Sequence, residues 1–322
     1  MKRTILPLFI IIVILVIPNV NYGQTPNLGA ASGFTLFTAT GAFTNLGTTN
    51  ISGDIGTNAG LFTGFPPGVV NGQIHVADAA SVMAATAVQT AYTYMSTLGG
   101  SVLGVLLGNS QELTPGTYNT GAASTLNGNL TLNAQGNPNA IFIIRIGGAF
   151  ATGISSNVIL INSASVCNVY WQIGGQFDMG DNSVFAGTAL VDGAVNMLEG
   201  SILNGRILSR AGAISTHNIT AAYLPSAAGA ITGTAVVCQG QTGVAYTVPI
   251  IPNATSYTWT LPSGALIVSG INTNSILVDF NLTSTSGYVS VFGSNSCGNG
   301  TVSSGFSVTV SPLPPTSAIF HY

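Results

Sequence analysis

Four short segments with the same layout constrain the fold of this chain more than any other feature. They are GAFATG at 148–153, GQFDMG at 175–180, GAVNML at 193–198 and GAISTH at 212–217. Their starts are 27, 18 and 19 residues apart, and each places a short apolar stretch after a glycine. A period near 20 residues with one short strand per side is typical of one coil of a β-solenoid. The uneven spacing indicates loops that differ in length from coil to coil.

The surrounding sequence supports a mainly β fold over residues 25–224, because short apolar runs such as IFIIRI at 141–146 are separated by Gly or Asn-Gly. Residues 77–98 differ, since they hold strong helix formers and neither Gly nor Pro. We expect one long helix here, with Asp78 as its N-cap and Gly99-Gly100 as its stop. One stripe of this helix is expected to pack on the side of the solenoid: Ala80, Met83, Ala84, Ala87, Ala91, Tyr94, Met95 and Leu98.

The residue pattern of the sequence changes near residue 224. Small residues at 225–229 predict a linker, and alternating strands at 230–313 predict an immunoglobulin-like β-sandwich. Trp259 lies between Cys238 and Cys297, an order typical of immunoglobulin-like cores, so we expect a Cys238–Cys297 disulfide and an unpaired, buried Cys167. Residues 314–322 are predicted to be a tail or the start of a further module.

The N-terminus has the layout of a secretory signal peptide, predicted over residues 1–24. Lys2 and Arg3 form a positive start, and an apolar run follows at 5–17. The expected location is therefore secreted or extracellular, with cell-surface association left open, and no membrane span is expected in the mature chain.

Charge excludes several classes of function. Only 4% of the 322 residues are charged, and Lys and Arg number five, so no basic patch for nucleic acid can form. The carboxylates fall in turn-like or capping contexts, without the pairing that hydrolysis of a polysaccharide needs. Asp178 and Asp181 are near a glycine and are candidates for Ca²⁺, but acids are common in such turns. We expect no enzyme, no metal and no cofactor.

Longer motifs identify a resemblance. They are TNISGDIGTNAGLFTGFPPGVVNGQIHVADAA at 49–80, LTPGTY at 113–118, LTLNAQGNPNAIFIIRIG at 130–147, CNVYWQIGG at 167–175 and LNGRILSRAGAIS at 203–215. In this order they closely resemble the bacterial and fungal ice-binding protein family, over about residues 28–224. The resemblance implies a discontinuous right-handed β-helix of triangular section with a long helix alongside. It also implies adsorption to ice, with inhibition of ice growth and recrystallisation. Residues 227–313 resemble PKD-like or immunoglobulin-like modules of secreted proteins.

In this family a flat β-helix face binds ice, and strand alternation predicts which residues lie on that face. Large apolar residues should point inward: Phe43, Leu126, Phe150, Phe177 and Met197. Their neighbours then point outward in one column of Thr125, Ala149, Gln176, Asn196 and Ser215, and a second of Ala151, Asp178 and His217. Ala42 and Thr44 are their counterparts in the N-terminal coil. Many family members carry more Thr here, so Gln176, Asp178 and His217 depart from the family pattern.

The main alternative function is a cell-surface adhesin or carbohydrate-binding protein on a β-helix scaffold. Sugar sites usually stack rings on exposed aromatic side chains, whereas Trp171 lies in an apolar strand and Trp259 in a predicted sandwich core. The sequence therefore favours the ice surface as partner of the first domain. It leaves open a cell-surface or glycan contact through the second domain.

Overall fold

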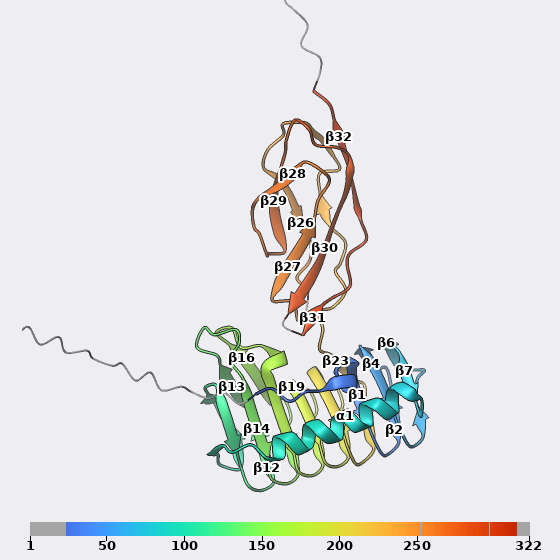
Figure 1. Cartoon of the computed structure of the whole chain (residues 1–322), viewed down its shortest axis with the longest axis vertical. Coiled ribbons are helices and arrows are strands. Elements are labelled where there is room, and N and C mark those ends of the chain that lie inside the picture. The colour runs from blue at the N-terminus through green and yellow to red at the C-terminus, as the bar shows by residue number, and fades with distance from the viewer. Residues whose placement is uncertain (1–23, 252, 296, 314–322) are drawn as a thin grey trace, which may run out of the picture.

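The computed structural model describes residues 24–313 except 252 and 296, and it shows a parallel-strand solenoid followed by an antiparallel β module (Figure 1). Of the predicted signal peptide only Gln24 is among the described residues, and the predicted tail at 314–322 lies outside them. The mainly β fold with one long helix and a second β module is confirmed.

The solenoid has three faces, each a row of parallel strands from successive coils. The helix-covered face comprises β7 (Ile74–Val76), β4 (Asp54–Thr57), β1 (Phe34–Thr38), the second halves of β21 (Ile202–Ser209) and β19 (Val184–Val191), β17 (Val169–Ile173), β14 (Phe142–Ile146), β11 (Gly116–Asn119) and β8 (Ser101–Val102). The third face comprises β6 (Val69–Asn71), β3 (Asn50–Ser52), β23 (Thr220–Ala222), the first halves of β21 and β19, β16 (Asn157–Ile161), β13 (Asn129–Asn133) and β10 (Gln111–Leu113). The strands of the remaining face, which we call the flat face, form a separate eight-stranded sheet.

Two glycines allow β19 and β21 to turn from the third face onto the helix-covered face. Gly187 and Gly205 are paired, with φ of +114° and +149°. A Cβ atom on Gly205 would lie 1.9 Å from the carbonyl oxygen of Gly187. Only glycine fits this close approach of the two backbones.

The coils do not stack in chain order. The first coil, β1 to β3, pairs on one side with the second coil and on the other with the last coil, formed by β21, β22 (Ile214–His217) and β23. The N-terminal and C-terminal coils of the solenoid are thus neighbours inside the stack. This arrangement fits the discontinuous β-helix that the resemblance implied.

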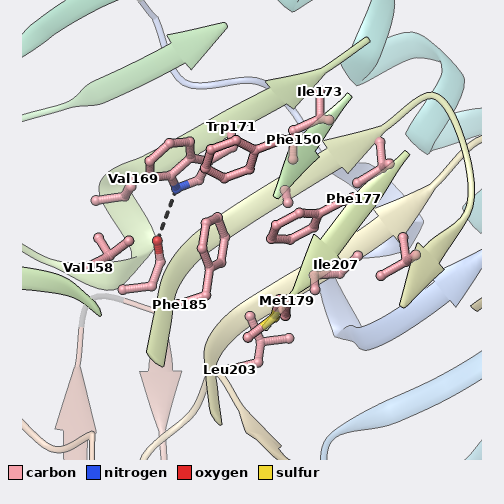
Figure 2. Packing of buried hydrophobic residues seen from close by; sticks show 14 of the residues in the cluster. Phe150, Val158, Val169, Trp171, Ile173, Phe177, Met179, Phe185, Leu203 and Ile207 are labelled. Atoms are coloured by element: carbon pink, nitrogen blue, oxygen red, sulfur yellow. Dashed lines mark hydrogen bonds between the residues drawn. The ribbon is translucent and has the colours of Figure 1, made fainter. Parts of the chain in front are cut away.

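Aromatic side chains fill the centre of the solenoid (Figure 2). The Phe150 ring stacks on Trp171 and Phe177 at centroid distances of 5.6 and 5.4 Å, and the Trp171 Nε1 donates a hydrogen bond to the Ala186 carbonyl. The side chains predicted to point inward are all buried: Phe43, Leu126, Phe150, Phe177 and Met197. Trp171 is also fully buried, as the sequence predicted.

Helix α1 (Ala79–Ser96) runs along the coils on the helix-covered face (Figure 1). Asp78 is its N-cap as predicted, and it forms a reciprocal capping box with Ser81. At the other end, Arg145 donates to the Ser96 and Leu98 carbonyls, which suits the negative end of the helix dipole. In the described residues no helix is long and apolar enough to cross a membrane.

The buried stripe of α1 differs in part from the predicted one. The buried residues are Ser81, Ala84, Val88, Ala91, Tyr92 and Met95. Ala84, Ala91 and Met95 were predicted correctly, whereas Met83 is 57% exposed. One residue corresponds to about 100° around a helix, so Met83 faces water although Ala84 is buried. The predicted stripe is rotated around the helix by less than one residue's turn of about 100°, and it therefore misses Val88 and Tyr92.

The C-terminal module is a sandwich of two sheets around its own apolar core. One sheet has the order β24 (Thr232–Gly233), β26 (Val244–Thr247), β29 (Ser275–Phe280) and β28 (Ala265–Ser269). The other has the order β25 (Val236–Cys238), β32 (Phe306–Ser311), β30 (Gly287–Asn295) and β27 (Ser256–Thr260), and β31 (Gly298–Asn299) pairs with β30. Trp259 is half-buried against the core and donates to the Thr273 carbonyl.

The predicted Cys238–Cys297 disulfide is wrong. Cys297 is bonded to Cys167 of the solenoid, with Cα atoms 5.4 Å apart, and Cys238 is free and exposed. Cys238 pairs with Ser311 at one end of its sheet, whereas Cys297 follows β30, which starts opposite Val308 and runs to the other end. At about 3.3 Å per residue the two sites lie more than about 25 Å apart, too far for a disulfide. The bond therefore joins the two parts of the chain.

Candidate functional site: the flat face

The flat face is the outward side of eight parallel strands in the order β5 (Phe62–Thr63), β2 (Phe43–Leu46), β22, β20 (Val195–Met197), β18 (Phe177–Met179), β15 (Phe150–Thr152), β12 (Ser124–Asn127) and β9 (Leu106–Gly108). Along most of these strands buried and accessible residues alternate. Apolar side chains fill the interior, so only the alternate residues meet water.

One outward residue from each strand lies in register with the next to form a central column. In order it contains Thr63, Thr44, Ser215, Asn196, Asp178, Ala151, Thr125 and Leu106. Parallel strands are about 4.8 Å apart, so the column is a regular row of small or polar side chains, ended by one leucine.

A second column lies two residues earlier in each repeat. Continuation of the backbone ladder identifies its members, because the next strand donates to their carbonyls: Leu61, Ala42, Ala213, Ala194, Gln176 and Ala149. Four of these six residues are alanine. The second column therefore consists mostly of short, apolar side chains, whereas the central column beside it is more polar.

The structure brings the nine predicted surface residues onto one face but regroups them. Thr44, Thr125, Ala151, Asp178, Asn196 and Ser215 share the central column, and Ala42, Ala149 and Gln176 share the second. The predicted grouping of Thr125, Asn196 and Ser215 with Ala149 and Gln176 is wrong, as is that of His217 with Ala151 and Asp178. His217 instead pairs with Leu46 at the edge of the face.

The error came from taking the largest apolar residue of each segment as the register marker. This marker aligns Met197 with Phe177, but the residue opposite Phe177 is Val195, and Met197 lies opposite Met179. Leu126 was likewise aligned with Phe150, whose partner is Ser124. A shift of two residues preserves the outward direction and changes only the column. Counting from the glycine that opens each segment gives the observed alignment for Val195.

Sequence reasoning missed Thr63, although a signal was present. The segment GLFTG at 60–64 repeats the G-x-F-T pattern of GAFTN at 41–45. In the structure Phe62 pairs with Phe43 and Thr63 with Thr44. Ala194 and Ala213, which occupy the position of Gln176 in their own segments, were missed because of the two-residue register error.

Asp178 is the one carboxylate in the central column. Its two oxygens accept hydrogen bonds from Gln176 Nε2 at 2.7 and 2.8 Å, and one also accepts from Asn196 Nδ2 at 2.7 Å. These neutral donors hold the carboxylate within the plane of the face. Gln176 and Asp178, which both depart from the threonine-rich pattern of the family, are thus hydrogen-bonded to each other.

A shallow hollow of about 260 Å³ interrupts the face near Ala149 and Ala151. Val105, Leu106, Thr125 and Asp178 are among the residues that line it. Phe150 belongs to the lining too, but its ring is buried. The hollow offers one carboxylate and no exposed aromatic ring, so it has neither the acid pair of a glycosidase nor a platform for a sugar.

Most remaining charges of the solenoid serve local structure. Arg210 forms a two-point ion pair with Asp192, both distances being 2.7 Å, and this hydrogen bonding raises the pKa of Arg210. His75 contacts Asp78 at 2.7 Å and Asp54 at 3.8 Å beside the start of α1. Among the described residues no group of three His, Cys, Asp or Glu side chains is arranged to hold a metal ion.

The fold and this face define a class: discontinuous parallel β-helix proteins with a helix along one side and a face of small, mostly uncharged side chains. Residues 37–222 match the Ice-binding-like family model, and the chain belongs to that family, which is one of ice-binding proteins and not of enzymes. Residues 224–308 match the model of the PKD-like domain.

Relatives with this fold come from bacteria and fungi. An ice-binding protein of Nostoc sp. (strain HG1) is 33% identical over 197 residues, or 60% of this chain and 70% of the Nostoc protein. The crystal structure of an ice-binding protein from an Antarctic Flavobacteriaceae bacterium is similar with a TM-score of 0.60 and 43% identity, over 62% of this chain and 48% of that one. That of the Antarctic ascomycete Antarctomyces psychrotrophicus gives a TM-score of 0.59 and 30% identity, over 62% and 98%.

Proposed function

We propose that this chain is a secreted ice-binding protein that adsorbs to ice through the flat face and so inhibits ice growth and recrystallisation. The observation that carries the proposal is the in-register central column, with the alanine-rich column beside it. Neighbouring strands lie about 4.8 Å apart and alternate residues about 7 Å apart, so such a surface presents a regular two-dimensional grid.

The chemistry of the grid suits ordered water. Methyl groups and small hydroxyl or amide groups can hold water in an array, whereas exposed charges impose their own hydration. The single carboxylate, Asp178, is already bonded to two side-chain amides in the plane. The arginines of the solenoid are engaged elsewhere, by Asp192, by the end of α1 and by Ser32. The flat face therefore has the low charge density that the proposed adsorption to ice needs.

The proposed contact residues are the nine from the sequence together with Thr63, Ala194 and Ala213. The face predicts that one bulky side chain will hold the whole plane away from the lattice. Replacing Ala151 by Tyr in the full chain should raise the concentration needed to stop recrystallisation at least about tenfold, equivalent to about 1.4 kcal/mol. Folding should be almost unchanged, because Ala151 points outward and is only partly buried.

The matched control is Thr131→Tyr, which adds the same ring to an outward position of β13 on the third face. This variant should keep wild-type partitioning into growing ice. If Ala151→Tyr folds and partitions like wild type, the flat face is not the ice-contacting surface. If Thr131→Tyr loses activity instead, the contact lies on the third face.

Secretion is supported by two features that are independent of the face. The residues before Gln24 have the layout of a signal peptide, and the Cys167–Cys297 disulfide requires an oxidising compartment. Expression with the native leader in a bacterium, followed by mass spectrometry, should find an oxidised chain that begins near residue 24 outside the cytoplasm. A reduced, full-length cytoplasmic chain would contradict this part of the proposal.

We further propose that the division between the domains lies near residues 225–229, and that the PKD-like module makes any cell-surface or glycan contact. Figure 1 shows the module on the side of the solenoid away from the flat-face strands β2 and β12. Residues 253–255 and Asn295 of the module line a hollow with Val158 and Asn204 of the third face. A glycan array probed with the full chain tests this role, and binding that is lost with Ala151→Tyr would place the glycan contact on the flat face and contradict it.

A further inference from the structure

Arg206 is a buried cation for which no Asp or Glu side chain provides a counter-charge. It lies in β21 and is 7% exposed. All eight Asp and Glu residues of the chain are among the described residues, yet none forms an ion pair with Arg206. Arg210, four residues later, has a two-point ion pair with Asp192. A buried charge without a counter-charge is unfavourable, so the contacts of Arg206 require explanation.

The guanidinium is held by neutral groups. Its Nε donates to the Ser32 carbonyl at 3.0 Å, and its Cζ lies 3.7 Å from the centroid of the Tyr223 ring. Burial lowers the pKa of Arg206, and interactions with Tyr223 and Tyr170 oppose that effect. Because an arginine stays protonated in proteins, the site carries a net positive charge.

Arg206 lines a wide-open surface cavity of about 440 Å³ that is formed by three segments of the chain. The N-terminal segment contributes Thr25, Pro26, Asn27, Leu28, Gly29 and Ser32, the solenoid contributes Cys167, Tyr170 and Arg206, and the module contributes Cys297. No carboxylate is in this lining, and Arg206 is its one formal charge. The lining also includes the hydroxyl-bearing residues Thr25, Ser32 and Tyr170, of which Thr25 and Tyr170 are hydrogen-bonded to each other.

We propose that this cavity binds a small oxyanion, a carboxylate, phosphate or sulfate group, with Arg206 as its cationic anchor. The planar fork of a guanidinium matches two oxygens of such a group, and the hydroxyl groups of the lining can donate to the others. The anion supplies the counter-charge that no Asp or Glu side chain provides. Since the lining includes both cysteines of the disulfide, the bound anion also contacts the junction of solenoid and module. This site is independent of the flat face.

The test measures thermal unfolding of the oxidised full chain in inorganic phosphate against sodium chloride of equal ionic strength. Phosphate at ten times its dissociation constant should raise Tm by about 3–6 °C, with saturation. Arg206→Gln should abolish this rise. Arg210→Gln, which removes the same charge from a paired site, should retain it. Sulfate and acetate in separate arms distinguish tetrahedral from planar anions.

A second variant keeps the proposal falsifiable if Arg206→Gln does not fold. Ser32 is exposed, and its carbonyl already contacts Arg206, so Ser32→Glu places a carboxylate beside the cavity. This variant should have a higher Tm than wild type without phosphate and should gain nothing from phosphate. Equal phosphate effects on wild type and every variant, or no saturable effect on wild type, would overturn the proposal.

Discussion

The flat face and the helix-covered face are built from the same coils by the same parallel pairing, yet only one of them is open to water. Outward residues of the helix-covered face include Phe37, Leu208, Leu190, Tyr170 and Ile143, and all are buried against α1 or the N-terminal segment. Their counterparts on the flat face are small or polar, from Thr44 to Thr125. The outward side chains, and not the backbone, decide which face is covered and which is open to water.

The polar residues of the helix-covered face form hydrogen bonds with α1 and with each other. Gln172 and Arg145 lie in register with Leu190, and they meet the C-terminal turn of α1. Gln172 Nε2 donates to the Tyr92 carbonyl, and Arg145 Nε donates to Gln172 Oε1. On the flat face Gln176 and Asn196 bond sideways to Asp178 instead. Polar groups there satisfy one another within the plane and require no covering element.

The largest loss of stability is expected from a change in the solenoid interior, which lies behind both faces. Phe150→Ala removes a ring stacked between Trp171 and Phe177 and should lower the free energy of unfolding by about 3–5 kcal/mol. Urea unfolding of the full chain measures this loss. A loss below about 1 kcal/mol would mean that the interior tolerates a cavity, against its close packing.

The comparison predicts opposite behaviour for two outward residues. Leu190 is outward but fully buried by α1, so Leu190→Ala should cost about 2–5 kcal/mol. Ser215 is outward on the flat face, so Ser215→Ala should change stability by less than about 0.5 kcal/mol. Similar values for the two variants, measured by the same unfolding transition, would contradict the division into covered and open faces.

Acid should loosen the helix before it disturbs the flat face. The Ser81 backbone N–H, together with the hydrogen bond to His75, holds the pKa of Asp78 below its ordinary value of 3.8. A lowered folded-state pKa stabilises the fold above pH 3.8, and this stabilisation is lost as pH falls below that value. Circular dichroism at 222 nm between pH 6 and 2.5 should show a steeper loss in wild type than in Asp78→Asn, which keeps a neutral cap. Identical profiles would exclude this carboxylate as the cause.

The smallest effect is expected at the one charge in the central column. Asp178→Asn keeps the shape and removes the charge, so ice activity should rise slightly, by less than about 0.5 kcal/mol or roughly twofold. The carboxylate is already bonded by Gln176 and Asn196, which limits the gain. The concentration that stops recrystallisation gives the comparison. A strong loss would show that Asp178 itself contributes to adsorption.

The sequence predicted those parts of the fold that depend on local pattern. Gly-bounded apolar segments gave the solenoid, and Asp78 with the following alanine-rich run gave α1. Which side chains of the flat face point outward followed from strand alternation alone. Register did not, because Val195 and Met197 are both apolar and two residues apart, so periodicity cannot tell which one lies opposite Phe177. Pairing between distant strands decides that question.

The cysteines show a second limit. Trp259 between two cysteines is typical of an immunoglobulin-like core, but the pairing depends on which ends of the strands meet. Cys297 lies in a turn beside the solenoid, where η2 (Val166–Asn168) presents Cys167. No local signal links two residues 130 positions apart. Arg206 also gave no signal, since its isolation from carboxylates is visible only in three dimensions.

The position of the first coil inside the stack has a consequence for how the chain is made. In ordinary solenoids each coil contacts its sequence neighbours and the array can grow from one end during synthesis. Here Thr44 bonds to the Ile214 carbonyl, 170 residues away. The first coil can pair with the second early, but its other side has no partner until β21 to β23 emerge from the ribosome. The chain must close a very long loop before its sheets are complete, which favours slow, all-or-none folding.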